Sequence, residues 1–148
     1  MSLIQKINED MKSAMKGGDK DRLEVLRFVI AGLNGAQKEK SIKEKETMLT
    51  DDEVVTILQK EAKRRKESIE LFKQGKRDDL VKKEEADLAV IFAYLPKELS
   101  REEIEKMVDD LKQKGFTDFN SLMRETMKLV KGRADGKTVG EVIKAKTG

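Results

Sequence analysis

Apolar residues recur every three or four positions along almost the whole chain, and no segment alternates strictly between apolar and polar residues. This period indicates amphipathic helices rather than strands. Glycines, helix-capping residues and a single proline, Pro96, interrupt it at intervals. The pattern therefore predicts an all-α protein with a four-helix N-terminal unit followed by a small three-helix C-terminal unit, as residues 1–96 and 97–148.

Each of the first four expected helices is bounded by residues that cap or stop a helix. These boundary residues are Gly17 and Gly18, Asp19, Thr50 with Glu53, Gly75, Asp78, and Tyr94-Leu95-Pro96. The charged stretch 37–46 is either a solvated extension of the second helix or a mobile connector. Arg65 falls on the apolar face of the third helix, so we expect a partly buried guanidinium paired with a carboxylate of the fourth helix.

Pro96 to Leu99 is the expected linker, and three shorter helices follow it. Ser100 and Glu103 form a capping-box pattern at the start of the fifth helix, and Gly115 ends it. Either Asp118 or Asn120 starts the sixth. The expected inward residues of these helices are Ile104, Met107, Val108, Leu111, Leu122, Met123, Met127, Val130, Val139, Val142 and Ile143.

Composition removes several kinds of chemistry. The 148 residues include no cysteine and no histidine, which excludes disulfides, thiolate catalysis and the usual general base near neutral pH. Gly136-Lys137-Thr138 ends like a phosphate-binding loop but lacks the preceding glycine at the required spacing. We therefore expect no catalytic residue, metal site or cofactor. Without a signal peptide or an apolar run of membrane-spanning length, the expected location is the cytoplasm, with no membrane partner.

Charge is balanced overall but uneven along the chain. Residues 60–77 contain eight basic and three acidic residues, residues 124–148 contain seven and three, and residues 98–123 contain four and seven. In the first cluster the spacing of Lys63 from Glu67 suits an ion pair along a helix, which favours a solvated helix over a binding surface. The second cluster surrounds a glycine-rich corner between the last two helices.

That corner, residues 131–137, is the candidate binding site. Gly132 is placed to adopt a left-handed conformation and stop the preceding helix, and Asp135 to cap the next one. Cationic side chains then surround the exposed amides of a helix start, which favours a phosphate. The candidate RNA-binding residues are Lys128, Lys131, Gly132, Arg133, Gly136 and Lys137. The commoner alternative is a glycine-stopped helix, a capped successor and solvated lysines.

Several short motifs together carry a resemblance to a known family. They are Asp10-Met11-Lys12, Ala14-Met15-Lys16, Arg22-Leu23, Leu26-Arg27, residues 66–70 (Lys-Glu-Ser-Ile-Glu), Tyr94-Leu95-Pro96 and the corner 131–137. Over essentially the whole chain the sequence resembles the YqeY family of small bacterial proteins. Its C-terminal part also resembles the tail domain of one subunit of the tRNA-dependent amidotransferase, the GatB/YqeY domain.

The resemblance implies four helices followed by three, and an amidotransferase-like tail that helps to hold the tRNA body. By analogy, Lys131, Arg133 and Lys137 would face phosphate. We therefore expect a non-catalytic protein that binds tRNA or tRNA-like RNA through its backbone. One alternative is an accessory to an amidotransferase-related carbon–nitrogen ligase that uses glutamine as amido-nitrogen donor and depends on partner subunits. The other is a protein-interaction module, with an amidotransferase or another translation-related protein as candidate partner.

Overall fold

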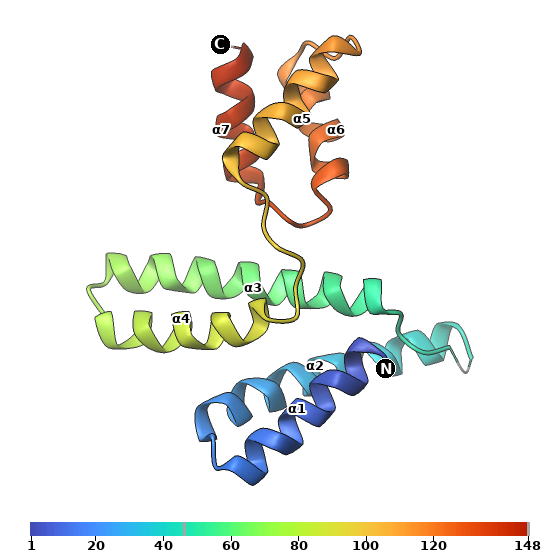
Figure 1. Cartoon of the computed structure of the whole chain (residues 1–148), viewed down its shortest axis with the longest axis vertical. Helices are drawn as coiled ribbons and strands as arrows, with labels where there is room; N and C mark the ends of the chain where they lie inside the picture. The colour runs from blue at the N-terminus through green and yellow to red at the C-terminus, as the bar shows by residue number, and fades with distance from the viewer. Residues whose placement is uncertain (46, 148) are drawn as a thin grey trace. The chain divides into compact units, whose positions relative to one another are not determined.

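The computed structural model describes residues 1–45 and 47–147, and within them it contains seven α-helices and no strand (Figure 1). The helices are α1 (Leu3–Gly17), α2 (Lys20–Lys43), α3 (Asp51–Gln74), α4 (Asp78–Phe92), α5 (Arg101–Gln113), α6 (Phe119–Val130) and α7 (Gly136–Thr147). The predicted all-α class is confirmed. The chain divides into two compact units, Met1–Leu95 and Pro96–Gly148, called here the first and second units.

Helix boundaries follow the capping residues. The Thr50 hydroxyl accepts a hydrogen bond from the Glu53 amide at 3.1 Å, and the Glu53 carboxylate accepts one from the Thr50 amide at 3.1 Å. This is the complete capping box that the sequence predicts. Ser100 makes the first half of the same arrangement, accepting from the Glu103 amide at 3.1 Å. Asp118 caps α6 by accepting from the Ser121 amide, a bond that also lowers the pKa of the Asp118 carboxyl, so Asp118 rather than Asn120 starts the helix.

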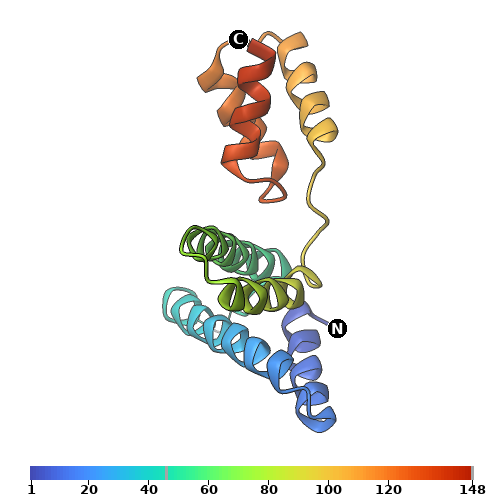
Figure 2. The same cartoon turned by 90° about the vertical axis from the view of Figure 1, so that its left-hand side faces the viewer.

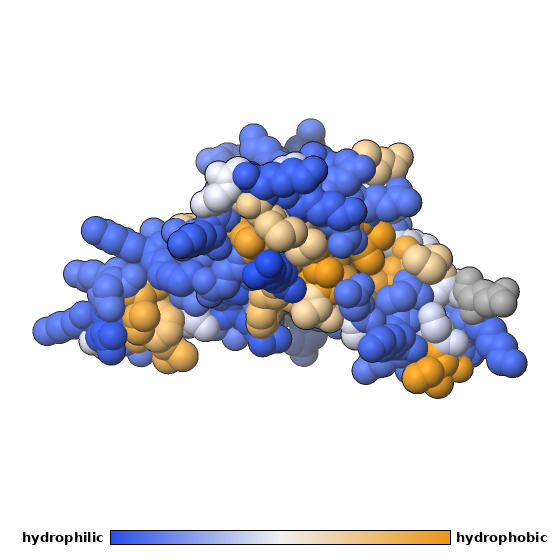
Figure 3. All heavy atoms as spheres, turned by 90° about the horizontal axis from the view of Figure 1, so that it is seen from below, coloured by the Kyte–Doolittle hydropathy of each residue, from blue (hydrophilic) through white to orange (hydrophobic). Residues whose placement is uncertain are grey.

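The first unit consists of two helical hairpins, α1 with α2 and α3 with α4 (Figures 1 and 2). Their inward faces form one aliphatic core. Its fully buried large side chains are Ile7, Leu26, Leu33, Val54, Leu58 and Ile91. Burying one such side chain stabilises the fold by roughly 1.5–3 kcal/mol. On the face shown in Figure 3, apolar side chains still lie open among the hydrophilic ones, which is usual for the surface of a folded protein.

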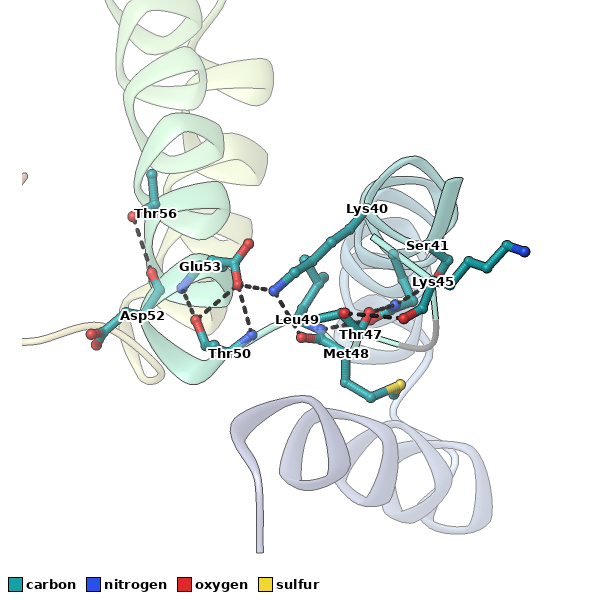
Figure 4. Close-up of polar contacts among 11 residues, drawn as sticks. Lys40, Ser41, Lys45, Thr47, Met48, Leu49, Thr50, Asp52, Glu53 and Thr56 are labelled. Atoms are coloured by element: carbon teal, nitrogen blue, oxygen red, sulfur yellow. Dashed lines mark hydrogen bonds and ion pairs between the residues drawn. The ribbon is translucent and has the colours of Figure 1, made fainter. Parts of the chain in front are cut away.

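The connection from α2 to α3 is held by side chains of α2. The helix continues to Lys43, so the charged stretch is a helical extension as far as that residue, while Glu46 lies outside the described residues. The Gln37 amide donates to the Thr47 carbonyl at 2.8 Å and accepts from the Leu49 amide at 2.7 Å. Lys40 reaches the Met48 carbonyl and the Glu53 carboxylate (Figure 4). These bonds position the start of α3.

Arg65 has the surroundings that its place on α3 predicts. Its side chain is 13% exposed, and it contacts Glu61 on its own helix at 3.1 Å and both Glu84 and Asp87 on α4, at 3.2 and 3.1 Å. The guanidinium also lies 5.3 Å from the centre of the Phe28 ring. The expected pairing with a carboxylate of the fourth helix is therefore confirmed, with two acids of α4 rather than one.

The second unit packs α5, α6 and α7 around a small core of its own. Its fully buried large side chains are Ile104, Val108, Leu122, Val130, Val139 and Ile143. One expected inward residue is wrong: Met127 is 36% exposed, whereas its neighbour Thr126 is completely buried. Within the described part of the chain the Thr126 hydroxyl has no hydrogen-bond partner. The helical phase of α6 places position 126, one turn beyond Leu122, towards the core, although the apolar residue is next to it.

Candidate anion-binding site in the second unit

Two consecutive residues in the left-handed region form the turn out of α6. Lys131 has a φ of 48° and Gly132 a φ of 79°, and the Arg133 amide then donates to the Val130 carbonyl at 2.9 Å. The sequence predicted this conformation for Gly132 and missed it for Lys131. A non-glycine residue at positive φ costs roughly 1 kcal/mol, so the turn is under local strain. This turn brings the chain from the end of α6 to the start of α7 in five residues.

The start of α7 is capped as predicted. The Asp135 carboxylate accepts a hydrogen bond from the Thr138 amide at 2.8 Å, and the Asp135 carbonyl accepts from the Val139 amide at 3.1 Å. The capping carboxylate thus satisfies one of the amides that the first helical turn leaves without an intrahelical partner. An anionic ligand would meet the remaining amides of the turn and the nearby cations, beside this acid.

Arg133 is bonded to the segment that precedes α5. Its Nε donates to the Lys97 carbonyl at 2.8 Å, and its own carbonyl accepts from the Leu99 amide at 2.8 Å. The side chain is half-buried and makes no ion pair with any described residue. The guanidinium is therefore held in place by a neutral acceptor, and no carboxylate of a described residue balances its positive charge. The sequence held no sign of this contact, because Lys97 lies 36 residues away.

The other predicted site residues differ in what they contact. Lys128 forms an ion pair with Glu125 at 3.2 Å, on the exposed surface of α6. Lys131 and Lys137 are exposed, and Lys137 makes no ion pair with the residues that the structure describes. Gly136 is half-buried, and a Cβ added there would lie 3.7 Å from Met123 Cε, an ordinary contact. Lys131, Arg133 and Lys137 thus share the corner, while Lys128 lies one turn back and is paired.

Sequence reasoning left one nearby cation out of the set. Lys144 is exposed and lies seven residues, or two helical turns, beyond Lys137 on the same face of α7. It makes no ion pair with a described residue. Its spacing from Lys137 was the signal that could have found it, because residues seven apart in a helix share a face.

An open surface pocket of about 500 Å³ lies elsewhere, in the first unit beside the α2–α3 connection. Its lining includes Lys40, Lys43, Asp52 and Glu53 over a floor of Leu49 and Ile57. The Lys40 ammonium bonds to Glu53 and lowers the pKa of that carboxyl, so these two charges satisfy each other (Figure 4). Nothing in this pocket provides a nucleophile with an adjacent base, and we assign no chemistry to it.

Three residues of the family motifs, Asp10, Arg22 and Tyr94, meet at the end of the first unit together with Lys6. The Tyr94 hydroxyl donates to the Asp10 carboxylate at 2.6 Å, and Lys6 and Arg22 lie 2.9 and 3.9 Å from the same carboxylate. These bonds, that of Tyr94 above all, lower the pKa of Asp10. Burial, together with the bond to Asp10, raises the pKa of Tyr94 to about 12. The cluster fastens the chain to α1 just before Pro96, which is a structural role.

Fold and site define a small all-α protein whose second unit carries a cationic, glycine-rich corner. A family model described as "Yqey-like protein" matches residues 4–147, and the chain belongs to this YqeY family. The resemblance seen in the motifs is thereby confirmed. Of the helices described, not one combines the length and the apolar composition needed to cross a membrane.

Similar proteins occur in fungi. A protein of Pyrenophora tritici-repentis named "Altered inheritance of mitochondria protein 41, mitochondrial" is 30% identical, over 97% of this chain and 82% of its own length. Proteins of the same name from Kluyveromyces lactis and Vanderwaltozyma polyspora are 31% and 29% identical, over 96% and 80% of this chain. Their names place these relatives in mitochondria, and say nothing of RNA or of an amidotransferase.

Proposed function

We propose that the second unit binds tRNA or tRNA-like RNA through the phosphate backbone, without catalysing a reaction. The observation that carries the proposal is Arg133, a guanidinium fixed by a neutral carbonyl and left without a carboxylate partner among the described residues. It shares the corner with Lys131 and Lys137 at the start of a helix. Arginine suits this role because its planar fork can bond two phosphate oxygens at once.

The recognition would depend on shape and charge. Contacts to phosphate position a protein on RNA but do not read its sequence. Cations that are already held in place lose less conformational entropy on binding than free ones. Arg133 meets this condition through its bond to Lys97, whereas Lys137 supplies a flexible point charge.

The test is charge reversal at the corner. Arg133→Glu together with Lys137→Glu is expected to abolish retention of tRNA in a filter-binding assay at constant salt. The matched control is Lys60→Glu with Lys63→Glu, two exposed lysines of α3 that give the same change in net charge. Circular dichroism has to show the same helical content in both variants and the parent.

The outcomes separate the possibilities. Loss of binding in the corner variant alone supports the proposal. Equal loss in both variants would mean unspecific attraction to the whole protein, and unchanged binding in the corner variant would remove the corner from consideration. Because Arg133 also holds the Lys97 carbonyl, Lys137→Glu by itself is a useful intermediate, since it changes charge without touching that bond.

The first alternative keeps the family's link with amidation. As an accessory to a glutamine-dependent carbon–nitrogen ligase, the protein would stimulate a complete amidotransferase acting on misacylated tRNA. Adding the protein to the purified enzyme with glutamine and ATP tests this directly, and an unchanged rate argues against it.

The protein-interaction alternative rests on apolar side chains exposed on α6, among them Met127 and Leu129. A pull-down with and without ribonuclease distinguishes an RNA-bridged association from a direct one.

Three further expectations remain part of the proposed function: a cytoplasmic location, a bacterial source, and separate domains at 1–96 and 97–148. Cell fractionation and limited proteolysis between residues 96 and 99 test the location and the domains.

A further inference from the structure

Five phenylalanines are present in the chain, and two of them lie close together in sequence in the second unit with opposite surroundings. Phe116 packs against the core of that unit. Phe119, the first residue of α6, is 37% exposed and is not part of that core. An exposed large aromatic side chain that does not contribute to the core is a candidate for ligand contact.

The tip of the Phe119 ring approaches α7 at Gly140. Its Cζ is 4.0 Å from the position that a Cβ would take on Gly140. Since an added Cβ would make only an ordinary contact there, packing within the unit does not require a glycine. Glycine in the middle of a helix destabilises it relative to alanine. At position 140 it leaves the surface of α7 beside the ring without a side chain.

Cations lie on the same face of α7. Lys137 and Lys144 are three residues before and four residues after Gly140, so all three positions share one side of the helix. Both lysines are exposed, and neither forms an ion pair with a described residue. The ring of Phe119 likewise has no cation over it among the described side chains, unlike Phe28, whose ring is next to Arg65. The Phe119 ring thus approaches the side of α7 that also carries Lys137 and Lys144, two lysines without an ion pair to a described residue.

We infer that Phe119 is a stacking platform for an unpaired RNA base whose flanking phosphates contact Lys137 and Lys144. The inference rests on the proposed function and names the part of the RNA that is recognised, a single-stranded loop or end. Aromatic rings with neighbouring cations are the usual means of holding unpaired nucleotides, because every base has a face that can stack. A base inside a duplex cannot reach such a ring without leaving its stack.

The test compares three probes: a tRNA, a 12-nucleotide single-stranded RNA and a perfect RNA duplex. Phe119→Leu keeps an apolar side chain but removes the aromatic face. It is expected to weaken binding of the single strand and of the tRNA about fivefold to tenfold, while affinity for the duplex changes less than twofold. Phe28→Leu is the matched control, the same substitution at an exposed phenylalanine of the first unit, and leaves all three affinities unchanged.

A second variant gives a direct reading. The chain contains no tryptophan, so Phe119→Trp introduces a single tryptophan at the platform, whose emission can be excited selectively at a wavelength that tyrosine does not absorb. Its emission is expected to be quenched by the single-stranded RNA but not by the duplex, and its affinity to equal that of the parent. Equal affinities of the Phe119→Leu variant and the parent for single strand and tRNA would overturn the inference while leaving the proposed function intact. If the parent itself retained no RNA, the proposed function would fail first.

Discussion

Arg65 in the first unit and Arg133 in the second are both partly buried arginines held by hydrogen bonds, and they differ in what holds them. Arg65 is surrounded by Glu61, Glu84 and Asp87, so its charge is more than balanced by its partners. Arg133 donates to the Lys97 carbonyl and meets no carboxylate of a described residue. A guanidinium bonded to acids has its charge balanced within the fold. One bonded to a neutral carbonyl is held in position while its charge stays available to a ligand. The count of basic residues in a segment does not reveal this difference.

The strongest way to break the comparison is Arg65→Met. With the guanidinium removed, three carboxylates remain close together in a poorly solvated place, and the free energy of unfolding is expected to fall by about 3 kcal/mol. Urea denaturation measures the change, and tRNA binding at low urea is expected to stay the same. The control Arg64→Met removes a 72% exposed arginine paired with Glu61 at 3.5 Å, and we expect a loss below about 0.5 kcal/mol. A similar loss of unfolding free energy for both variants would show that the three acids around Arg65 add nothing to the effect of removing an arginine.

The equivalent change in the second unit is Arg133→Met. Losing the bond to Lys97 is expected to lower the free energy of unfolding by about 1.5 kcal/mol. Affinity for tRNA is expected to fall about fivefold, which corresponds to about 1 kcal/mol. Arg133→Lys sharpens the comparison because it keeps the charge without the planar fork, so stability falls and affinity is expected to lie between that of the parent and that of the methionine variant. Equal affinities of the methionine variant and the parent would remove Arg133 from the binding site.

Tyr94→Phe tests the remaining ionic cluster of the first unit. Removal of the hydroxyl that donates to Asp10 is expected to cost about 1 kcal/mol at neutral pH. The folded-state pKa of Asp10 is below its ordinary value of 3.8, so the stabilisation is present above that pH and is lost as the pH falls through the folded value. The gap between parent and variant in thermal midpoint should therefore narrow below about pH 3.8. A gap that stays constant down to about pH 2 would contradict an ionised Asp10 as the acceptor.

The smallest expected effect concerns salt. Each phosphate contact made by a lysine adds somewhat less than one unit to the slope of log affinity against log salt concentration. Lys137→Gln is expected to reduce that slope by about 0.7 to 0.9, while Lys60→Gln leaves it unchanged. Titrations at four salt concentrations are sufficient to measure both. An unaltered slope for the Lys137 variant would mean that this side chain meets no phosphate.

The helices and their ends could be predicted from the sequence because the interactions that define them are local. Thr50 and Glu53, or Asp135 and Thr138, are three residues apart, and the helix itself brings their atoms within bonding distance. The same holds for the left-handed Gly132 that stops α6. The pairing of Arg65 with an acid could also be predicted, since a guanidinium among the apolar residues of one helical face needs a carboxylate partner.

Tertiary structure decided which groups met. The Lys97 carbonyl, the second acid beside Arg65 and Gly140 at the tip of the Phe119 ring all come from other elements of the chain. Their distances depend on how helices pack, and a packing angle is set by many side chains together rather than by one motif. For this protein, the sequence alone determined most helix boundaries and which charges are near the corner, whereas the end of α2 and the choice between Asp118 and Asn120 at the start of α6 needed the structure. Only the folded units determined which of the basic side chains form ion pairs, because an acidic partner can come from a distant part of the chain.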